Sequence, residues 1–154
     1  MKAVVQRVAS ASVSVAGHEV SRIGHGLLIL LAVGNADTEE EARWTAEKCA
    51  ELRIFQDEQG KMNKSLLDAG GSALVVSQFT LYGDCSKGRR PSFTGAGAPE
   101  RAEELFGVFC DFMRGTGVEV QTGMFGEKML VAIQNDGPVT LIIEKENKGT
   151  GEAK

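Results

Sequence analysis

Apolar and polar residues alternate along the first fifteen residues of the chain. The apolar side of this pattern consists of Val5, Ala9, Ala11, Val13 and Val15. A period of two is typical of a strand with one buried face. Arg7 interrupts the apolar side, and a buried guanidinium needs a charged or hydrogen-bonding partner. Arg7 is therefore either a structural ion partner or a residue of a functional site.

Short apolar segments after this strand predict more of the sheet. Residues 17–24 are typical of a hairpin, and the continuous apolar run 26–34 predicts a central strand covered on both faces. The remaining strands are predicted at residues 72–79, 118–122, 129–134 and 139–144. Gly137 and Pro138 fall between the last two strands, where the sequence favours a turn.

Two helices are predicted between these strands. Thr38 and Glu41 have the spacing of a capping box, and small apolar residues then follow a helical stripe as far as Arg53. A second helix begins near Pro99 and ends at Gly115. Its stripe of phenylalanines and other apolar residues predicts packing in a core rather than a platform for base stacking.

These elements predict an α+β fold: a mixed or antiparallel sheet, or a barrel-like β core, with two main helices packed on it. A length of 154 residues suits one domain, which we assign to residues 1–145. Residues 146–154 are polar and are predicted to be a disordered tail.

Charge and composition exclude several classes of protein. The net charge of −4 argues against a broad basic surface for nucleic acid, and no DNA partner is expected. Lys87, Arg89 and Arg90 form a local basic cluster that is a candidate for RNA phosphate contacts. No apolar run reaches the length of a membrane span, and no signal peptide is recognisable, so a cytoplasmic location is the expectation.

Cysteine and histidine are too sparse to suggest a metal centre. Cys49, Cys85 and Cys110 are widely spaced, which argues against a disulfide framework and a zinc site; only Cys85 is expected to be exposed. His18 and His25 both lie near the early hairpin, so neither a Ser-His-Asp triad nor a metal-ligand set is predicted. We therefore expect no metal and no organic cofactor.

The segment SQFTLYGD, residues 77–84, ends a predicted strand in small polar and amide side chains. At such an end, backbone N–H groups leave the strand ladder and can face a ligand, as in an oxyanion hole. Thr80 is the hydroxyl to test as a nucleophile, although no base lies near it in the sequence.

Four segments of the chain, in the same order, resemble the bacterial type of the D-aminoacyl-tRNA deacylase family. They are MKAVVQRVASASVSV at the start, SQFTLYGD, GRRPSF at 88–93 and NDGPVT at 135–140. The resemblance spans roughly residues 1–145. It implies a homodimer with shared active sites that hydrolyses the ester of D-aminoacyl-tRNA and also accepts glycyl-tRNA.

The resemblance also implies roles for individual residues. The catalytic group consists of Gln78, Phe79 and Thr80, which act chiefly through their backbone together with the 2′-OH of the tRNA terminal ribose. The substrate-binding group consists of Ser77, Arg7, Gly137, Pro138, Val139 and Thr140. In the family the Gly-Pro bond is cis, and the dipeptide reaches from one subunit into the site of the other, where it excludes L side chains. Arg7 is implied to clamp that segment, and Lys87, Arg89 and Arg90 are candidates for tRNA contacts.

Two other functions remain open at this stage. One is an ordinary esterase with Thr80 or Ser77 as nucleophile. The other is a non-catalytic tRNA or RNA binder that uses the loop from Lys87 to Arg90, whose binding would weaken steeply as salt is raised.

Overall fold

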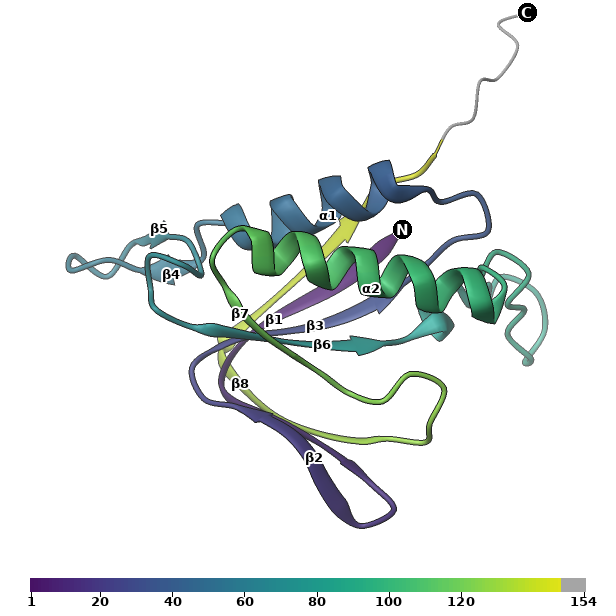
Figure 1. Ribbon diagram of the computed structural model, residues 1–154, viewed down its shortest axis with the longest axis horizontal. Helices are drawn as coiled ribbons and strands as arrows, with labels where there is room; N and C mark the ends of the chain where they lie inside the picture. The colour runs from purple at the N-terminus through teal and green to yellow at the C-terminus, as the bar shows by residue number, and fades with distance from the viewer. Residues whose placement is uncertain (148–154) are drawn as a thin grey trace, which may run out of the picture.

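The structure, a computed structural model, describes residues 1–147 and is shown in Figure 1. Its strands are β1 (Lys2–Val15), β2 (His18–Ile23), β3 (Gly26–Ala32), β4 (Phe55–Gln56), β5 (Met62–Lys64), β6 (Ser72–Ser77), β7 (Glu119–Thr122) and β8 (Leu130–Glu144). The helices are α1 (Glu39–Glu51) and α2 (Pro99–Gly115), and a single 3₁₀ turn, η1, spans Phe79–Tyr82. Most of the predicted disordered tail, residues 148–154, lies outside the described residues.

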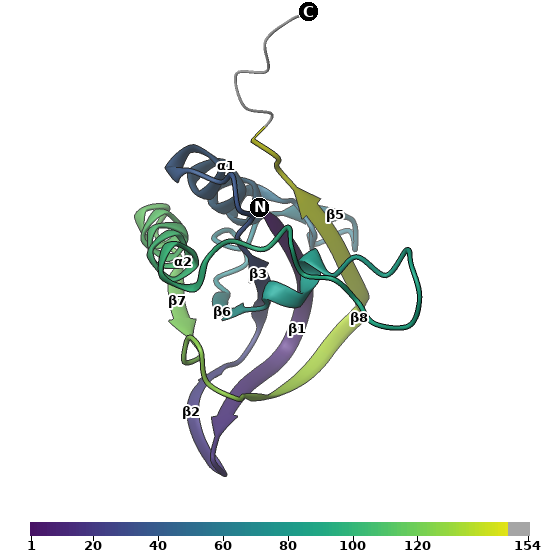
Figure 2. The same cartoon turned by 90° about the vertical axis from the view of Figure 1, so that its right-hand side faces the viewer.

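Six of the strands form one mixed sheet, in agreement with the α+β prediction, and β4 and β5 form a separate two-stranded sheet. The order of the mixed sheet is β2-β1-β3-β6-β7, and β8 pairs with β1 as well. β1 is antiparallel to its three neighbours, whereas β3, β6 and β7 run parallel. The parallel connections pass through α1 and α2, which lie side by side on one face of the sheet (Figures 1 and 2). A bond of 3.0 Å from the Arg22 N–H to the Gln121 side chain links β2 to β7 and nearly closes the sheet.

The main core lies between the two helices and the sheet. It is formed by fully buried side chains from β3, α1 and α2, including Leu27, Ile29, Ala46, Leu105 and Phe109. A second cluster on the other face of the sheet contains Leu28 and Leu74, so β3 is covered on both faces as predicted. No helix among residues 1–147 is long and apolar enough to cross a membrane.

Local signals in the sequence placed both helices correctly. The Thr38 N–H donates to the Glu41 carboxylate (2.7 Å), and the Thr38 hydroxyl accepts from the first turn, which is the predicted capping box. α1 ends at Glu51, two residues before the predicted end. Cys49 and Cys110 are buried in the core, where desolvation raises the pKa of each thiol to about 12, and Cys85 is exposed as predicted.

Three details of the predicted strands were wrong. Ala9 is exposed and Val8 is buried, because the pairing of β1 with β8 shifts register on either side of Val8. β6 ends at Ser77 and the chain then enters η1, so the strand does not extend to residue 79. The pattern also gave no indication of the small hairpin formed by β4 and β5.

The largest correction concerns residues 129–144, where two strands joined by a turn were predicted. The structure has a single strand, β8, which runs from Leu130 to Glu144 through Gly137 and Pro138. β8 pairs with β1 over nearly its whole length, and this long partner keeps the chain extended where local sequence favours a turn. Figure 2 shows β8 crossing the whole sheet beside β1.

Met1, which precedes β1, is held in the core by a buried ion pair. The α-ammonium of Met1 is fully buried and lies 2.9 Å from the Asp37 carboxylate. The same carboxylate accepts a bond of 2.6 Å from the Gly34 N–H, just after β3. The Met1 ammonium also donates to the Lys145 carbonyl (2.6 Å), just after β8. One carboxylate and one ammonium therefore join the ends of three strands.

We expect the substitution Asp37→Asn to lower the free energy of unfolding by about 3 kcal/mol, because it leaves a buried ammonium without its counter-ion. Urea denaturation followed by circular dichroism measures this loss. Asp111→Asn is the control, since Asp111 pairs with Arg114 with 80% of its side chain exposed and should cost under about 1 kcal/mol. Equal losses for the two variants would contradict a structural role for the Asp37 pair.

Candidate functional site

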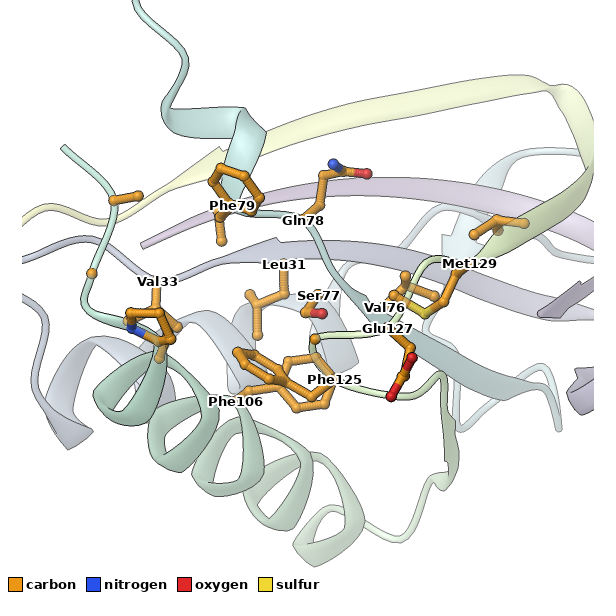
Figure 3. A pocket seen from close by; sticks show the side chains of 17 residues that line it. Leu31, Val33, Val76, Ser77, Gln78, Phe79, Phe106, Phe125, Glu127 and Met129 are labelled. Carbon is orange, nitrogen blue, oxygen red and sulfur yellow. The ribbon is translucent and has the colours of Figure 1, made fainter. Parts of the chain in front are cut away.

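A cavity of about 470 Å³ opens where β3 and β6 end, between η1, α2 and the segment that leads into β8 (Figure 3). Apolar side chains make up most of its walls. They include Leu31, Val33, Val76, Phe106, Phe125, Met129 and Val131. Ser77, Gln78 and Phe79 also line it, so the strand end singled out from the sequence forms one side of a real cavity.

The backbone leaves the sheet at this strand end. The Gln78 N–H still donates to the Leu31 carbonyl (2.8 Å), which continues the pairing of β6 with β3. The next turn begins with a bond of 3.2 Å from the Leu81 N–H to the Gln78 carbonyl. The amides of Phe79 and Thr80 precede that bond, so the turn does not use them. These two N–H groups are the candidates for an oxyanion hole.

The Thr80 side chain lies beside the cavity rather than inside it. Thr80 is exposed, is not among the lining residues, and accepts a hydrogen bond from the Gln78 side-chain amide. Neither His18 nor His25 lines the cavity. Among residues 1–147, the hydrogen bond found at the Thr80 hydroxyl comes from Gln78, and none joins it to a histidine that could act as its base.

Sequence reasoning missed the opposite wall of the cavity. Phe106 of α2 and Phe125 face each other with ring centroids 5.9 Å apart, and Glu127 and Met129 extend the same wall. In Figure 3 Phe106 and Phe125 lie next to each other below Ser77, and Glu127 and Met129 follow on the right. The available signal was weak: Phe106 belongs to the predicted apolar stripe of α2, but it lies at the edge of that stripe and is only half-buried.

The second predicted group of residues lies in a bulge of β8. Gln6 pairs with Thr140 and Val8 pairs with Asn135, so residues 136–139 lie opposite Arg7 alone. The side chain of Asn135 spans this bulge: its oxygen accepts from the Val139 N–H (3.1 Å), and its amide donates to the Thr140 hydroxyl (2.8 Å). Asn135 was not among the predicted site residues, although its side chain shapes the segment that contains them.

Arg7 lies opposite the bulge and forms hydrogen bonds to it. Its guanidinium donates to the carbonyls of Ile54 (2.7 Å) and Asp136 (3.3 Å), and Nε lies 3.3 Å from the Asp136 carboxylate. Only 6% of Arg7 is exposed. Arg7 is therefore a buried ion partner, the first of the two interpretations from the sequence, and its bonds to Asp136 lie next to Gly137. Its role in a functional site stays a prediction.

Gly137 occupies a position that excludes other residues. Its φ of +124° lies in the region that L side chains rarely adopt, and the Gly137-Pro138 bond is cis. A Cβ atom here would lie 2.8 Å from the Val139 side chain and 3.2 Å from the Arg7 guanidinium. The bulge and the arginine are therefore packed around a residue without a side chain.

The structure does not bring the two predicted groups together within one chain. β1 and β3 separate β8 from β6, and neither Arg7 nor any residue from Gly137 to Thr140 lines the cavity. Gly137, Pro138 and Thr140 are exposed, and Val139 is half-buried. The bulge thus presents its outer side to solvent, away from the cavity of its own chain.

The predicted basic cluster lies on an exposed loop between η1 and α2. Lys87, Arg89 and Arg90 are all exposed. The loop is closed at its base by two backbone bonds between Asp84 and Ser92, of 2.7 and 3.0 Å. In Figure 2 it projects on the side of η1 that faces away from α2. Beside its base, the exposed rings of Phe79 and Phe93 pack edge to face with centroids 5.3 Å apart.

Comparison with known proteins gives one consistent result. A family model described as D-Tyr-tRNA(Tyr) deacylase matches residues 4–144. A D-aminoacyl-tRNA deacylase of Desulfitobacterium hafniense is 57% identical over 95% of this chain and 98% of its own length. One of Roseiflexus sp. is 59% identical over 94% of this chain and 93% of its own length.

Two solved structures share the fold. The chain named c-Myc DNA Unwinding Element Binding Protein superposes with a TM-score of 0.90 at 43% identity, and the match covers 96% of this chain and all of that one. A probable eukaryotic D-amino acid tRNA deacylase gives a TM-score of 0.80 at 21% identity, covering 92% of this chain and 97% of that one. The second likeness concerns the fold alone.

We expect Arg7→Lys to lower the free energy of unfolding by about 2 kcal/mol, because an ammonium cannot reproduce the fork of bonds to two carbonyls. Denaturant titration gives the loss, and hydrogen exchange at the Val139 amide reports on the bulge. The control is Arg22→Lys, whose pair with Glu19 is exposed and screened by solvent, so that a much smaller loss is expected. Unchanged exchange at Val139 in Arg7→Lys would contradict the positioning role.

Proposed function

This chain belongs to the D-Tyr-tRNA(Tyr) deacylase family, and on that basis we propose how its own residues hydrolyse the ester of a D-aminoacyl-tRNA. The observation that carries the proposal is the strand end at Ser77, Gln78 and Phe79, which lines a cavity and turns two backbone amides out of the sheet. The substrate supplies an ester, and the products are a free D-amino acid and tRNA.

The ester carbonyl is placed at the amides of Phe79 and Thr80. When water adds to the carbonyl carbon, negative charge develops on its oxygen, and each preorganised N–H donor is worth about 3 kcal/mol in stabilising that charge. The 2′-OH of the terminal ribose, which belongs to the substrate, assists the attack. An aminoacyl ester is already reactive, so this arrangement needs no side-chain nucleophile.

Chirality is read by the Gly137-Pro138 segment of a second subunit. Within one chain the segment is exposed and lies apart from the cavity, so only another copy can bring it to the substrate. A backbone bulge held by Arg7 and Asn135 is a fixed point in space, which steric rejection of an L side chain requires. Val139 and Thr140 complete that surface. Glycine has no side chain to reject, so glycyl-tRNA is accepted too.

The outer side of β8 supports a homodimer. β8 is an edge strand paired only with β1, and it exposes four large apolar side chains: Leu130, Ile133, Leu141 and Ile142. Two of them, Leu130 and Ile142, are more than 70% exposed. An exposed apolar edge strand is a site of association, and this one carries the Gly137-Pro138 bulge at its centre.

We assign contacts with the tRNA phosphate backbone to the loop that contains Lys87, Arg89 and Arg90. These three cations are exposed beside η1, and they form a local basic patch on a chain whose net charge is −4. Since charged tRNA is used in translation, we place the enzyme in the cytoplasm.

A nucleic-acid binder without catalysis is the alternative, and the name of one structural relative, which refers to a DNA unwinding element, is the observation that favours it. The acidic net charge counts against it. Hydrolysis assays separate the two functions, because a binder alone releases no amino acid.

We expect the protein to hydrolyse D-tyrosyl-tRNA faster than L-tyrosyl-tRNA by roughly a hundredfold, the usual cost of misplacing a reacting group by about 1 Å. The two substrates are compared at catalytic enzyme concentration with a chelator present. Equal rates would leave a hydrolase without a chiral filter. Cleavage of neither, with salt-sensitive binding of uncharged tRNA, would favour the non-catalytic binder.

We expect Thr80→Ala to retain kcat/KM for D-tyrosyl-tRNA within about tenfold, because its hydroxyl only accepts a bond from Gln78. Loss of a nucleophile would instead lower the rate by about 10⁴-fold or more. Ser77→Ala tests the other hydroxyl of the motif, and Thr94→Ala, in the exposed loop, is the control. A collapse of activity in Thr80→Ala alone would establish the esterase mechanism and remove the backbone account.

A further inference from the structure

We propose that the ring of Tyr82, which lies against two glycines, fixes the position of η1 and of the two backbone amides at its start. This makes Tyr82 a positioning residue for the proposed reaction. The inference rests on the proposed function, because it concerns how the amides of Phe79 and Thr80 are held in place. It gives a role to a side chain that does not line the cavity.

η1 is a single turn with few side-chain anchors of its own. None of its four residues is fully buried, and the first two are exposed. The half-buried side chains of Leu81 and Tyr82 are therefore the ones that can pack it onto the rest of the protein. The Leu81 N–H donates to the Gln78 carbonyl (3.2 Å), and the Gly83 N–H donates to the Thr80 carbonyl (2.9 Å). Because these bonds tie the turn together, a contact at its last residue also positions its first two.

The ring of Tyr82 packs closely against Gly34 and Gly95. A Cβ atom at Gly34 would lie 2.6 Å from the Tyr82 oxygen and 3.0 Å from the ring carbon that bears it. One at Gly95 would lie 3.3 Å from the ring edge. Neither glycine has a positive φ, so neighbouring atoms, and not the backbone conformation, favour glycine at these positions. The ring is also covered by Lys2, whose Nζ lies 4.8 Å from its centroid.

The backbone behind the ring is firmly tied to the core. The Gly34 N–H donates to the Asp37 carboxylate (2.6 Å), which pairs with the buried Met1 ammonium. The Asn35 N–H donates to the Gly95 carbonyl (3.0 Å), so both glycines belong to the same support. A methyl group added at Gly34 would therefore displace the ring, by roughly 0.8 Å if an ordinary contact of 3.4 Å is to be restored. η1 would move with it.

The Tyr82 hydroxyl is not placed to take part in the chemistry. Tyr82 does not line the cavity. Burial, with the nearby negative charge of Asp37, raises the pKa of Tyr82, so the phenol stays neutral at physiological pH. We therefore assign the role to the shape of the ring, and its contact with Gly34 gives a way to test it.

The experiment measures kcat and KM for D-tyrosyl-tRNA. Gly34→Ala should lower kcat by roughly tenfold to a hundredfold, since misplacing a catalytic group by about 1 Å costs about a hundredfold. KM should not change, because the amides act on the charge that develops in the transition state. Tyr82→Phe removes the oxygen that the new methyl group meets, so the double variant Gly34→Ala/Tyr82→Phe should recover most of the lost kcat.

Gly24→Ala is the matched control, since a Cβ atom at Gly24 has no neighbour within 4 Å and Gly24 does not line the cavity. Its kcat should equal that of the wild type. Rates are compared at a temperature at which circular dichroism shows each variant to be folded. If Gly34→Ala does not fold, Gly95→Ala, which makes the milder contact, gives the same test and should show a smaller loss of kcat.

A kcat in the folded glycine variant equal to that of the control overturns the inference. A loss in KM alone also overturns it, as does a loss in Gly34→Ala that Tyr82→Phe does not relieve. A large loss in Tyr82→Phe by itself would assign the hydroxyl to the chemistry and would likewise overturn it. Since the wild type still cleaves D-tyrosyl-tRNA in each of these cases, failure of the inference is distinguishable from failure of the proposed function.

Discussion

A buried guanidinium in the middle of β1 is the constraint on which the account of this site depends. Arg7 is almost fully buried in a strand whose neighbours on the same face are apolar, and an unpaired charge there would cost several kcal/mol. It is satisfied by the carbonyl of Ile54 and by the carbonyl and carboxylate of Asp136. These bonds hold β8 in a bulge opposite Arg7, and the bulge presents Gly137 and Pro138 on the outer side of the sheet.

The two parts of the proposed site lie apart within one chain. The end of β6 supplies a cavity and two backbone amides, whereas the bulge of β8 supplies an exposed surface that does not reach that cavity. A dimer across the exposed apolar edge of β8 would unite them, and neither part would depend on a flexible side chain. The division also explains why the site contains so few titratable groups: the proposed chemistry depends on positioned backbone atoms, and the ester is already reactive.

The parts of this structure that could be predicted from the sequence are those fixed by local signals. The capping box at Thr38, the proline at the start of α2 and the apolar run of β3 each specify their element within a few residues. The strand end at Ser77 was identified as a candidate site for its exposed backbone, and it does line the cavity.

The parts that could not be predicted depend on partners distant in the sequence. Gly137 and Pro138 resemble a turn locally, yet the pairing of β8 with β1, about 130 residues away in the chain, keeps them within a strand. The wall with Phe125 and Glu127 has no periodic pattern of its own, and it becomes a wall only because α2 and β8 place it opposite Ser77. The sequence motif thus indicated one side of the cavity, the strand end at Ser77, but not the wall that contains Phe125.

The central claim is that the chiral filter, the Gly137-Pro138 segment, acts on the cavity of the other subunit. The most direct test uses purified mixed dimers, in which the two subunits are different variants with different tags. Phe79→Pro removes one N–H from the cavity at a turn position that tolerates proline, and Pro138→Ala trims the filter. The account predicts that Pro138→Ala homodimers cleave both D- and L-tyrosyl-tRNA. In a mixed dimer, the intact cavity belongs to the Pro138→Ala subunit and faces the intact Gly137-Pro138 segment of the Phe79→Pro subunit. Mixed dimers should therefore cleave only the D ester. Cleavage of the L ester by mixed dimers at the homodimer rate per intact cavity would show that the filter acts within its own chain, and would contradict the account.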